Sequence, residues 1–94
     1  MVKIKWTHHA LEELDDIANY ISKDSPKYAQ ILVKQIYEIV SHLKQFPKLG
    51  RKVPEYGDPE LREILYKTYR IIYLVKKEHL EIISIIHGSR KLNL

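Results

Sequence analysis

Residues 61–92 read LREILYKTYRIIYLVKKEHLEIISIIHGSRKL, and this stretch decides the fold. It is rich in β-branched and aromatic residues, and short polar runs divide it, which predicts two or three neighbouring β-strands. The strands carry apolar residues on both faces, and each apolar face of a small sheet needs a covering layer. The rest of a 94-residue chain can supply only one such layer. We therefore expect the other face to bind a partner.

Length and composition predict one domain, residues 1–94, with a modest core built from the 45% of residues that are hydrophobic. The chain has no cysteine, which excludes disulfides and thiolate metal sites and favours a reducing compartment. No apolar run approaches the roughly 18 residues of a membrane span, and the N-terminus lacks a signal-peptide pattern. We expect a soluble, cytoplasmic protein without cofactor or metal.

The charge is unevenly distributed along the chain. Residues 7–25 carry five acidic side chains against one lysine, whereas the whole chain has a net charge of +4. A basic body with one acidic helix suits a polyanionic or acidic partner. The alternative is the ordinary solvated surface of a lysine-rich protein.

The first half of the chain predicts a strand and two helices. Residues 2–6 alternate apolar and basic side chains, as in a strand with one buried face. Thr7 can cap a first helix, and Ser25, followed by proline at the first helical position, can cap a second that runs to about Phe46. Residues 47–59 are rich in proline and glycine and predict an irregular connection. The order predicts an α+β fold with an N-terminal strand and a two-helix hairpin packed on a small, mostly antiparallel sheet.

Side-chain parity assigns the two faces of the sheet. If the turn around Lys77 holds an even number of residues, Val75 pairs with Leu80 and Arg70 with Ile85. A two-residue turn at 67–68 adds Glu63 to the face of Arg70, and a one-residue slip would reverse every assignment. The face assigned to the helices holds Tyr69, Ile71, Tyr73, Val75, Leu80, Ile82, Ser84 and Ile86. The opposite, free face holds Arg70, Ile72, Leu74, Ile83, Ile85 and His87.

Four segments carry a family resemblance: WTHHALEELDDIANYI at the start, FPKLGRKVPE in the loop, LRE…YRIIYLV, and the closing IIHGSRKL. In this order and spacing the chain resembles the RelE/ParE superfamily of toxins from type II, plasmid-stabilisation-type toxin–antitoxin systems, in particular the ParE-like branch. The resemblance implies a helical hairpin on a curved antiparallel sheet. It also implies a cognate antitoxin whose C-terminal segment covers apolar sheet and helix surface. Ile72, Leu74, Ile83 and Ile85 are the residues expected to bind it, and to be more exposed than the helix-packed side.

The resemblance leaves two activities open. ParE-like members are described as inhibitors that trap DNA gyrase on DNA, whereas RelE-like members cleave mRNA on the ribosome. The RelE pattern places lysines in the strand before the YR motif, but that strand here begins Leu-Arg-Glu-Ile. The YoeB-like endonucleases use a glutamate, an arginine and a histidine, for which Glu63, Arg70 and His87 are the nearest matches, with Glu60 competing for the first place.

The endonuclease alternative has a definite chemistry. Attack by an RNA 2′-hydroxyl needs a base, an acid and a cation for the phosphorane charge. Glu63 and His87 could transfer protons, and Arg70 could hold the phosphate through its planar fork of donors. The other interpretation is that Arg70 pairs with Glu63 or the carboxy-terminus, while His87 simply ends a strand.

The remaining basic residues could contact nucleic acid or an acidic target surface, in a manner sensitive to salt. They are Arg51, Lys52, Arg62, Arg90 and Lys91. The alternative is that they only aid solubility, as we expect for Lys76 and Lys77 in the hairpin turn. The resemblance implies a toxin that binds gyrase and is neutralised by an antitoxin. The runner-up acts on ribosome and mRNA as an endonuclease, and a third possibility is a member that has lost toxicity.

Overall fold

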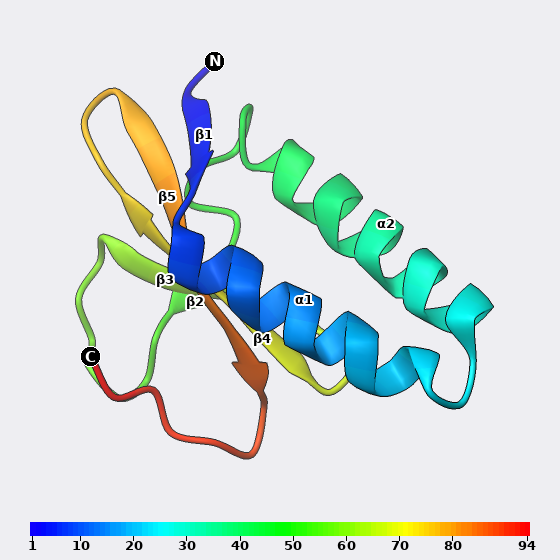
Figure 1. Ribbon diagram of the computed structural model, residues 1–94. Helices are drawn as coiled ribbons and strands as arrows, with labels where there is room; N and C mark the ends of the chain where they lie inside the picture. Colours follow the sequence, from blue (N-terminus) through cyan, green and yellow to red (C-terminus); the bar gives the residue numbers. More distant parts are fainter.

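A computed structural model describes residues 1–94 and shows two helices packed on one face of a five-stranded sheet (Figure 1). The elements in chain order are β1 (Lys3–Trp6), α1 (His8–Ser22), α2 (Pro26–His42), β2 (Arg51–Lys52), β3 (Leu61–Tyr66), β4 (Tyr69–Val75) and β5 (His79–His87). The order across the sheet is β1-β5-β4-β3-β2. Only the β1–β5 pair is parallel. The predicted fold class is confirmed.

A hydroxyl side chain caps the N-terminus of each helix. The Thr7 hydroxyl accepts the Ala10 N–H at 3.1 Å, and the Ser25 hydroxyl accepts the Tyr28 N–H at 3.1 Å. Each bond satisfies one of the free N–H groups that open a helix. Pro26 is the first residue of α2, where its missing N–H costs nothing.

The second helix ends earlier than its apolar pattern suggests. α2 stops at His42, not near Phe46, because the chain tightens there into bonds three residues apart. The Leu43 N–H reaches the Val40 carbonyl at 3.0 Å, and this turn places Leu43 in the core with no exposed surface. The connection of residues 47–59 also contains the two-residue strand β2, which pairs with β3.

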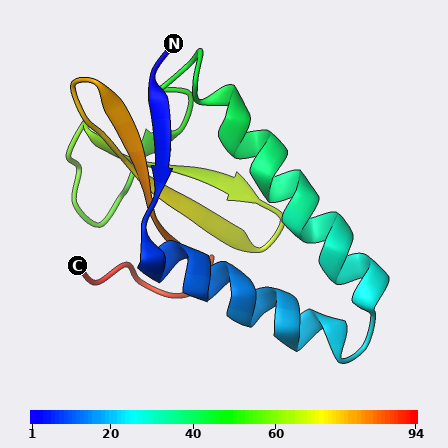
Figure 2. The ribbon, with the colours of Figure 1, turned by 45° about the horizontal axis from the view of Figure 1, so that its top comes forward.

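The main core lies between the helices and the sheet, and Figure 2 shows the two layers from a second side. α1 and α2 contribute one apolar stripe each, which is the reason for their apolar spacing of three and four residues. The buried residues are Ala10, Leu14, Leu32, Ile36, Val40, Leu43, Ile71, Tyr73, Leu80, Ile82 and Ile85.

The strand register agrees with part of the parity argument. Tyr66 pairs with Tyr69 across a two-residue turn in which Lys67 has a φ of 54°, so Glu63 lies on the face of Arg70 as predicted. Val75 pairs with Leu80, also as predicted.

A β-bulge then overturns the rest of the assignment. The register shifts between Ile72 and Tyr73, so Arg70 pairs with Ile86 rather than Ile85. One extra residue in a strand reverses the faces of all that follow it. Ile85 therefore belongs to the helix-side core, whereas Ile86 packs on the opposite face. His87 pairs with Tyr69, and the two rings meet edge to face with centroids 6.0 Å apart. The prediction that Arg70 and His87 share a face is wrong.

The chain itself covers much of the second face. A smaller cluster there joins Val53 of the loop and Leu92 of the C-terminal tail to strand residues Leu61, Ile72 and Ile86. Figure 1 shows the tail (red) running back beside the loop between β2 and β3. The predicted free patch is wrong for two of its four members: Ile72 is covered here and 0% exposed, whereas Ile85, which the bulge turns towards the helices, is 1% exposed. Leu74 and Ile83 remain half-buried.

Candidate functional site

Arg70, the arginine of the YR motif (Tyr69–Arg70), lies at the centre of a buried polar cluster on the second face. Its Nε donates to Glu63 Oε1 at 2.7 Å, and its Nη2 lies 2.6 Å from the same oxygen. Nη1 and Nη2 each lie 2.8 Å from an oxygen of Glu55, and Nη1 also donates to the Arg90 carbonyl at 2.9 Å. Four of these contacts are hydrogen bonds and the Nη2–Glu63 contact is an ion pair, so all three guanidinium nitrogens are engaged within the chain.

Glu63 is the most deeply buried acid of the cluster, with a side chain that is 0% exposed. Its second oxygen accepts the Arg51 Nε at 2.6 Å. Two arginines therefore compensate the buried carboxylate, as a buried charge requires. The prediction that Glu63 and Arg70 lie on one face is confirmed. The two side chains form an ion pair, which is the non-catalytic alternative considered for Arg70 in the sequence analysis.

Glu55 fastens the C-terminal tail to this cluster. Its Oε2 accepts the Leu92 backbone N–H at 2.7 Å in addition to the contact with Arg70. Hydrogen bonds from Arg70 and then from Leu92 lower the pKa of Glu55 to about 2. Bonds to Glu55 and then Glu63 raise the pKa of Arg70 further above its ordinary value, although burial opposes this. Sequence reasoning missed Glu55, because nothing in a proline-rich loop marks one acid as the partner of a strand arginine.

Three basic residues predicted to contact a target gather around the cluster. Arg51, Arg90 and Lys91 line, with Arg70 and Glu55, an open hollow of about 380 Å³ that has no hydrophobic lining residue. Arg51 and Arg70 are balanced by two carboxylates, whereas Arg90 and Lys91 form no ion pair and are exposed. The rim of the hollow therefore presents positive charge.

The other two predicted contacts lie apart from this rim. Arg62 donates to the Pro59 carbonyl at 2.8 Å and to the Gly50 carbonyl at 2.9 Å, so it supports the loop. Lys52, its cross-strand partner, is exposed.

His87 is not part of the Arg70 cluster. Its Nδ1 lies 2.8 Å from the Ser89 hydroxyl and accepts the Ser89 N–H at 3.2 Å, and the residue is exposed. It does not line the basic hollow. The three residues of the endonuclease hypothesis thus separate into a buried Glu63–Arg70 pair and a histidine at the end of β5.

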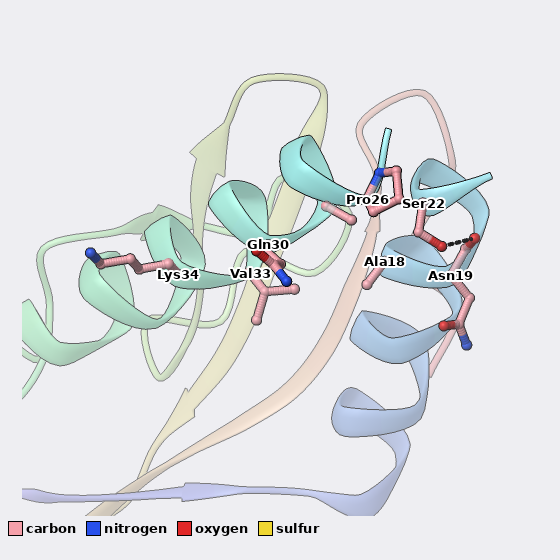
Figure 3. A pocket seen from close by; sticks show the side chains of 8 residues that line it. Ala18, Asn19, Ser22, Pro26, Gln30, Val33 and Lys34 are labelled. Atoms are coloured by element: carbon pink, nitrogen blue, oxygen red, sulfur yellow. Dashed lines mark hydrogen bonds between the residues drawn. The ribbon is translucent and has the colours of Figure 1, made fainter. Parts of the chain in front are cut away.

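A different hollow lies in the helical hairpin, between the end of α1 and the first turns of α2 (Figure 3). Its lining consists of small, amide and hydroxyl side chains with one cation, Lys34. Ser22 donates to the Asn19 carbonyl at 2.9 Å, a bond within α1. This lining offers no pair of titratable groups for acid–base chemistry.

Two further properties of the chain bear on its chemistry. No group of three or more histidine, aspartate or glutamate side chains could hold a metal ion. Neither helix is long and apolar enough to cross a membrane.

Comparison with known proteins places this geometry in context. Residues 4–92 match the family described as the ParE toxin of the type II toxin–antitoxin system, parDE. The chain is 32% identical over 91 residues to "Putative toxin Y4kP" of Sinorhizobium fredii, covering 95% of this chain and 91% of that protein. It is 31% identical over 91 residues to "Toxin RelE2" of Caulobacter vibrioides, covering 96% and 99%.

Solved structures agree with the fold. A chain of the chromosomal ParDE system from P. aeruginosa superposes with a TM-score of 0.76 at 28% identity, over 93% of this chain and 96% of that one. A conserved hypothetical protein from Helicobacter pylori shares the fold alone, with a TM-score of 0.55 and 15% identity over 95% and 97%.

Proposed function

Since the chain belongs to the ParE toxin family of type II toxin–antitoxin systems, we propose that it inhibits DNA gyrase by binding and without chemistry of its own. Its family gives it a cognate antitoxin as partner. The gyrase target rests on the ParE-like branch that the sequence resembles.

The observation that carries the proposal is the full engagement of Arg70. All three of its nitrogens are engaged within the chain, so the guanidinium would have to give up contacts with Glu55 or Glu63 before it could hold a scissile phosphate. His87 lies outside the cluster and cannot share a reacting group with Glu63 in this arrangement. A buried, neutralised arginine supports a structural role and favours a protein that acts by binding.

The basic rim is the surface we assign to the target. Arg90, Lys91 and the partly exposed Arg51, which also pairs with Glu63, present positive charge around the hollow. The hollow is large enough for an acidic loop or a phosphate. Such contacts accelerate encounter with an acidic surface and weaken as salt rises.

For the antitoxin we propose a smaller apolar surface than the four residues expected from the sequence. Leu74 and Ile83 are the apolar residues of the second face that the tail and loop leave half-exposed. We propose that the antitoxin covers these two, since Ile72 and Ile85 can be reached only by displacing parts of this chain.

Two assays on the purified chain test the proposal: inhibition of gyrase supercoiling, and cleavage of mRNA bound in ribosomes. We expect the first activity alone, unchanged in His87→Ala and reduced in Arg90→Glu/Lys91→Glu. Lys27→Glu, an exposed lysine at the start of α2, is the control for charge reversal. Cleavage lost in His87→Ala, with gyrase unaffected, would falsify the proposal.

The ribosome-dependent endonuclease stays the second candidate, because one relative is named RelE2 and because Glu63 and Arg70 do meet. It requires a rearrangement that frees Arg70 from Glu55. Inactivity in both assays would instead indicate a member that has lost toxicity.

A further inference from the structure

A third hollow, with a largely apolar lining, lies where three parts of the chain meet. It is bordered by residues next to β1, by the turn after α2 and by the β4–β5 turn. Figures 1 and 2 both place the N-terminus beside the connection that follows α2. The hollow measures about 600 Å³, and its apolar lining consists of Val2, Phe46, Leu49 and Val75 with Pro47. A volume of this size accommodates large side chains of a ligand.

The exposure of two of these residues needs an explanation. Phe46 is the only phenylalanine of the chain, and yet it is 60% exposed. Leu49 is 58% exposed. A lone exposed apolar residue is ordinary, but a phenylalanine and a leucine that border the same hollow form the kind of patch that marks an interaction site.

The two residues are held in place by the backbone. The Leu49 N–H bonds to the Phe46 carbonyl at 3.0 Å, which closes a four-residue turn with proline at its second position. Gly50 then passes so close to β3 that an added Cβ would lie 2.4 Å from the Glu63 carbonyl oxygen. The Gly50 N–H also donates to the Tyr73 hydroxyl at 2.9 Å. The apolar patch is therefore preorganised, which reduces the entropic cost of binding.

Lysines surround the apolar floor. Lys48, Lys76 and Lys77 line the hollow, and no acidic residue does. Glu60 lies 3.5 Å from Lys48, and Glu78 continues the β4–β5 turn, so two acids partly balance the three lysines. Lys76 and Lys77 form no ion pair.

We propose that this lysine-bordered hollow binds an acidic, amphipathic segment of a partner protein, which inserts one or two large apolar side chains between Phe46 and Leu49. The inference goes beyond the proposed function and does not rest on the gyrase target. Apolar anchors in a pocket with charge-complementary contacts at the rim are the usual anatomy of peptide recognition. A membrane surface also attracts lysines and apolar groups, but it requires side chains that project outward, whereas these line a concavity.

The test uses the full chain and a synthetic 14-residue probe peptide with leucine and phenylalanine on one helical face and glutamate on the other. Binding is followed by calorimetry, and backbone amide NMR shifts locate it. Phe46→Ser and Leu49→Ser should each weaken the binding at least about tenfold, as for central anchors. Lys76→Glu/Lys77→Glu should weaken it and reduce its dependence on salt. A scrambled peptide of the same composition should bind less tightly.

Matched controls change equivalent residues elsewhere. Tyr20→Ser removes another exposed aromatic side chain, and Lys34→Glu reverses a charge at the hairpin hollow of Figure 3, so both should bind the peptide normally. Thermal unfolding of each variant verifies that the chain is folded.

Several results would overturn the proposal. Binding that survives Phe46→Ser, shifts that centre on the hairpin hollow, or no binding at millimolar peptide would each do so. Adsorption to vesicles of phosphatidylcholine and phosphatidylglycerol that is lost in Phe46→Ser would identify a lipid surface instead. Self-association lost in the same variant would assign the hollow to a second copy of the chain.

Discussion

Arg70 and Glu63 face each other on neighbouring strands, and two guanidinium nitrogens lie 2.6 and 2.7 Å from one carboxylate oxygen. The side chains are 7% and 0% exposed. Water cannot compensate either charge if the other is removed. The pair therefore costs far more to break than to keep.

Arg70→Ala should lower the free energy of unfolding by about 3–5 kcal/mol, because it leaves Glu63 buried with only Arg51 as its partner. Arg70→Lys should recover only part of this loss, since an ammonium group cannot reproduce five planar donors. Urea unfolding measures both. Arg90→Ala is the control: its carbonyl, not its side chain, contacts the cluster, so the change should stay within about 0.5 kcal/mol. Equal effects of Arg70→Ala and Arg90→Ala would refute the role of the pair.

Lowering the pH should reduce the free energy of unfolding, because Glu55 becomes protonated. Its pKa is about 2 in the folded state against 4.5 ordinarily, so folding favours the carboxylate. This contribution to stability is fully present above pH 4.5 and is lost as pH falls towards 2. Glu55→Gln should be less stable above that window and lose less stability across it, as followed by thermal unfolding at each pH. Glu78→Gln, in the exposed β4–β5 turn, should leave the profile unchanged. If stability depended on pH in the same way in Glu55→Gln and in the unchanged chain, Glu55 could not be the group responsible.

The tail contributes one side chain, that of Leu92, to the smaller apolar cluster on the second face. Leu92 is 7% exposed and packs with Val53, Ile72 and Ile86. Leu92→Ala should cost about 2 kcal/mol, at the lower end for a buried leucine because the site lies near the surface. It should also raise the binding of a hydrophobic dye. Leu94→Ala, which changes a side chain of a residue that is 69% exposed, is the comparison, and a similar loss in both variants would argue against the packing.

Gly50 is required for a close approach and not for its own backbone conformation. Gly50→Ala should destabilise the chain by about 2–3 kcal/mol, because the new Cβ would overlap backbone atoms of Glu63 that cannot move aside. Gly57→Ala gives the contrast: its site is open, but its φ of +64° costs an L-residue about 1 kcal/mol. Denaturant titrations of both variants compare the two penalties. A smaller effect at Gly50 than at Gly57 would contradict the overlap.

The sequence predicts the features that local chemistry determines. Thr7 and Ser25 are identifiable as caps because each precedes an apolar pattern of helical period, and the two-residue turn at Lys67 places Glu63 beside Arg70. The bulge in β5 escapes prediction because Ile82, Ile83 and Ser84 contain no glycine or proline to mark it. Parity arguments assume uninterrupted alternation, so this one residue misplaces Ile85, Ile86 and His87 together.

The covering of the second face escapes prediction for another reason. Arg70 contacts Glu55 and the Arg90 carbonyl, and the Leu92 N–H contacts Glu55. These bonds join segments far apart in the chain, and no local pattern encodes them. Two apolar faces were correctly expected. That the chain's own loop and tail cover the second of them follows only from the three-dimensional structure.

The fastening of the tail by Glu55 also has a consequence for access to the second face. The tail is held there by the contacts of the Arg90 carbonyl with Arg70 and of the Leu92 N–H with Glu55. Local opening of these two contacts would uncover Ile72 and Ile86 while β3, β4 and β5 stay paired. An antitoxin segment that reached these two residues would therefore compete with the toxin's own tail for the same site.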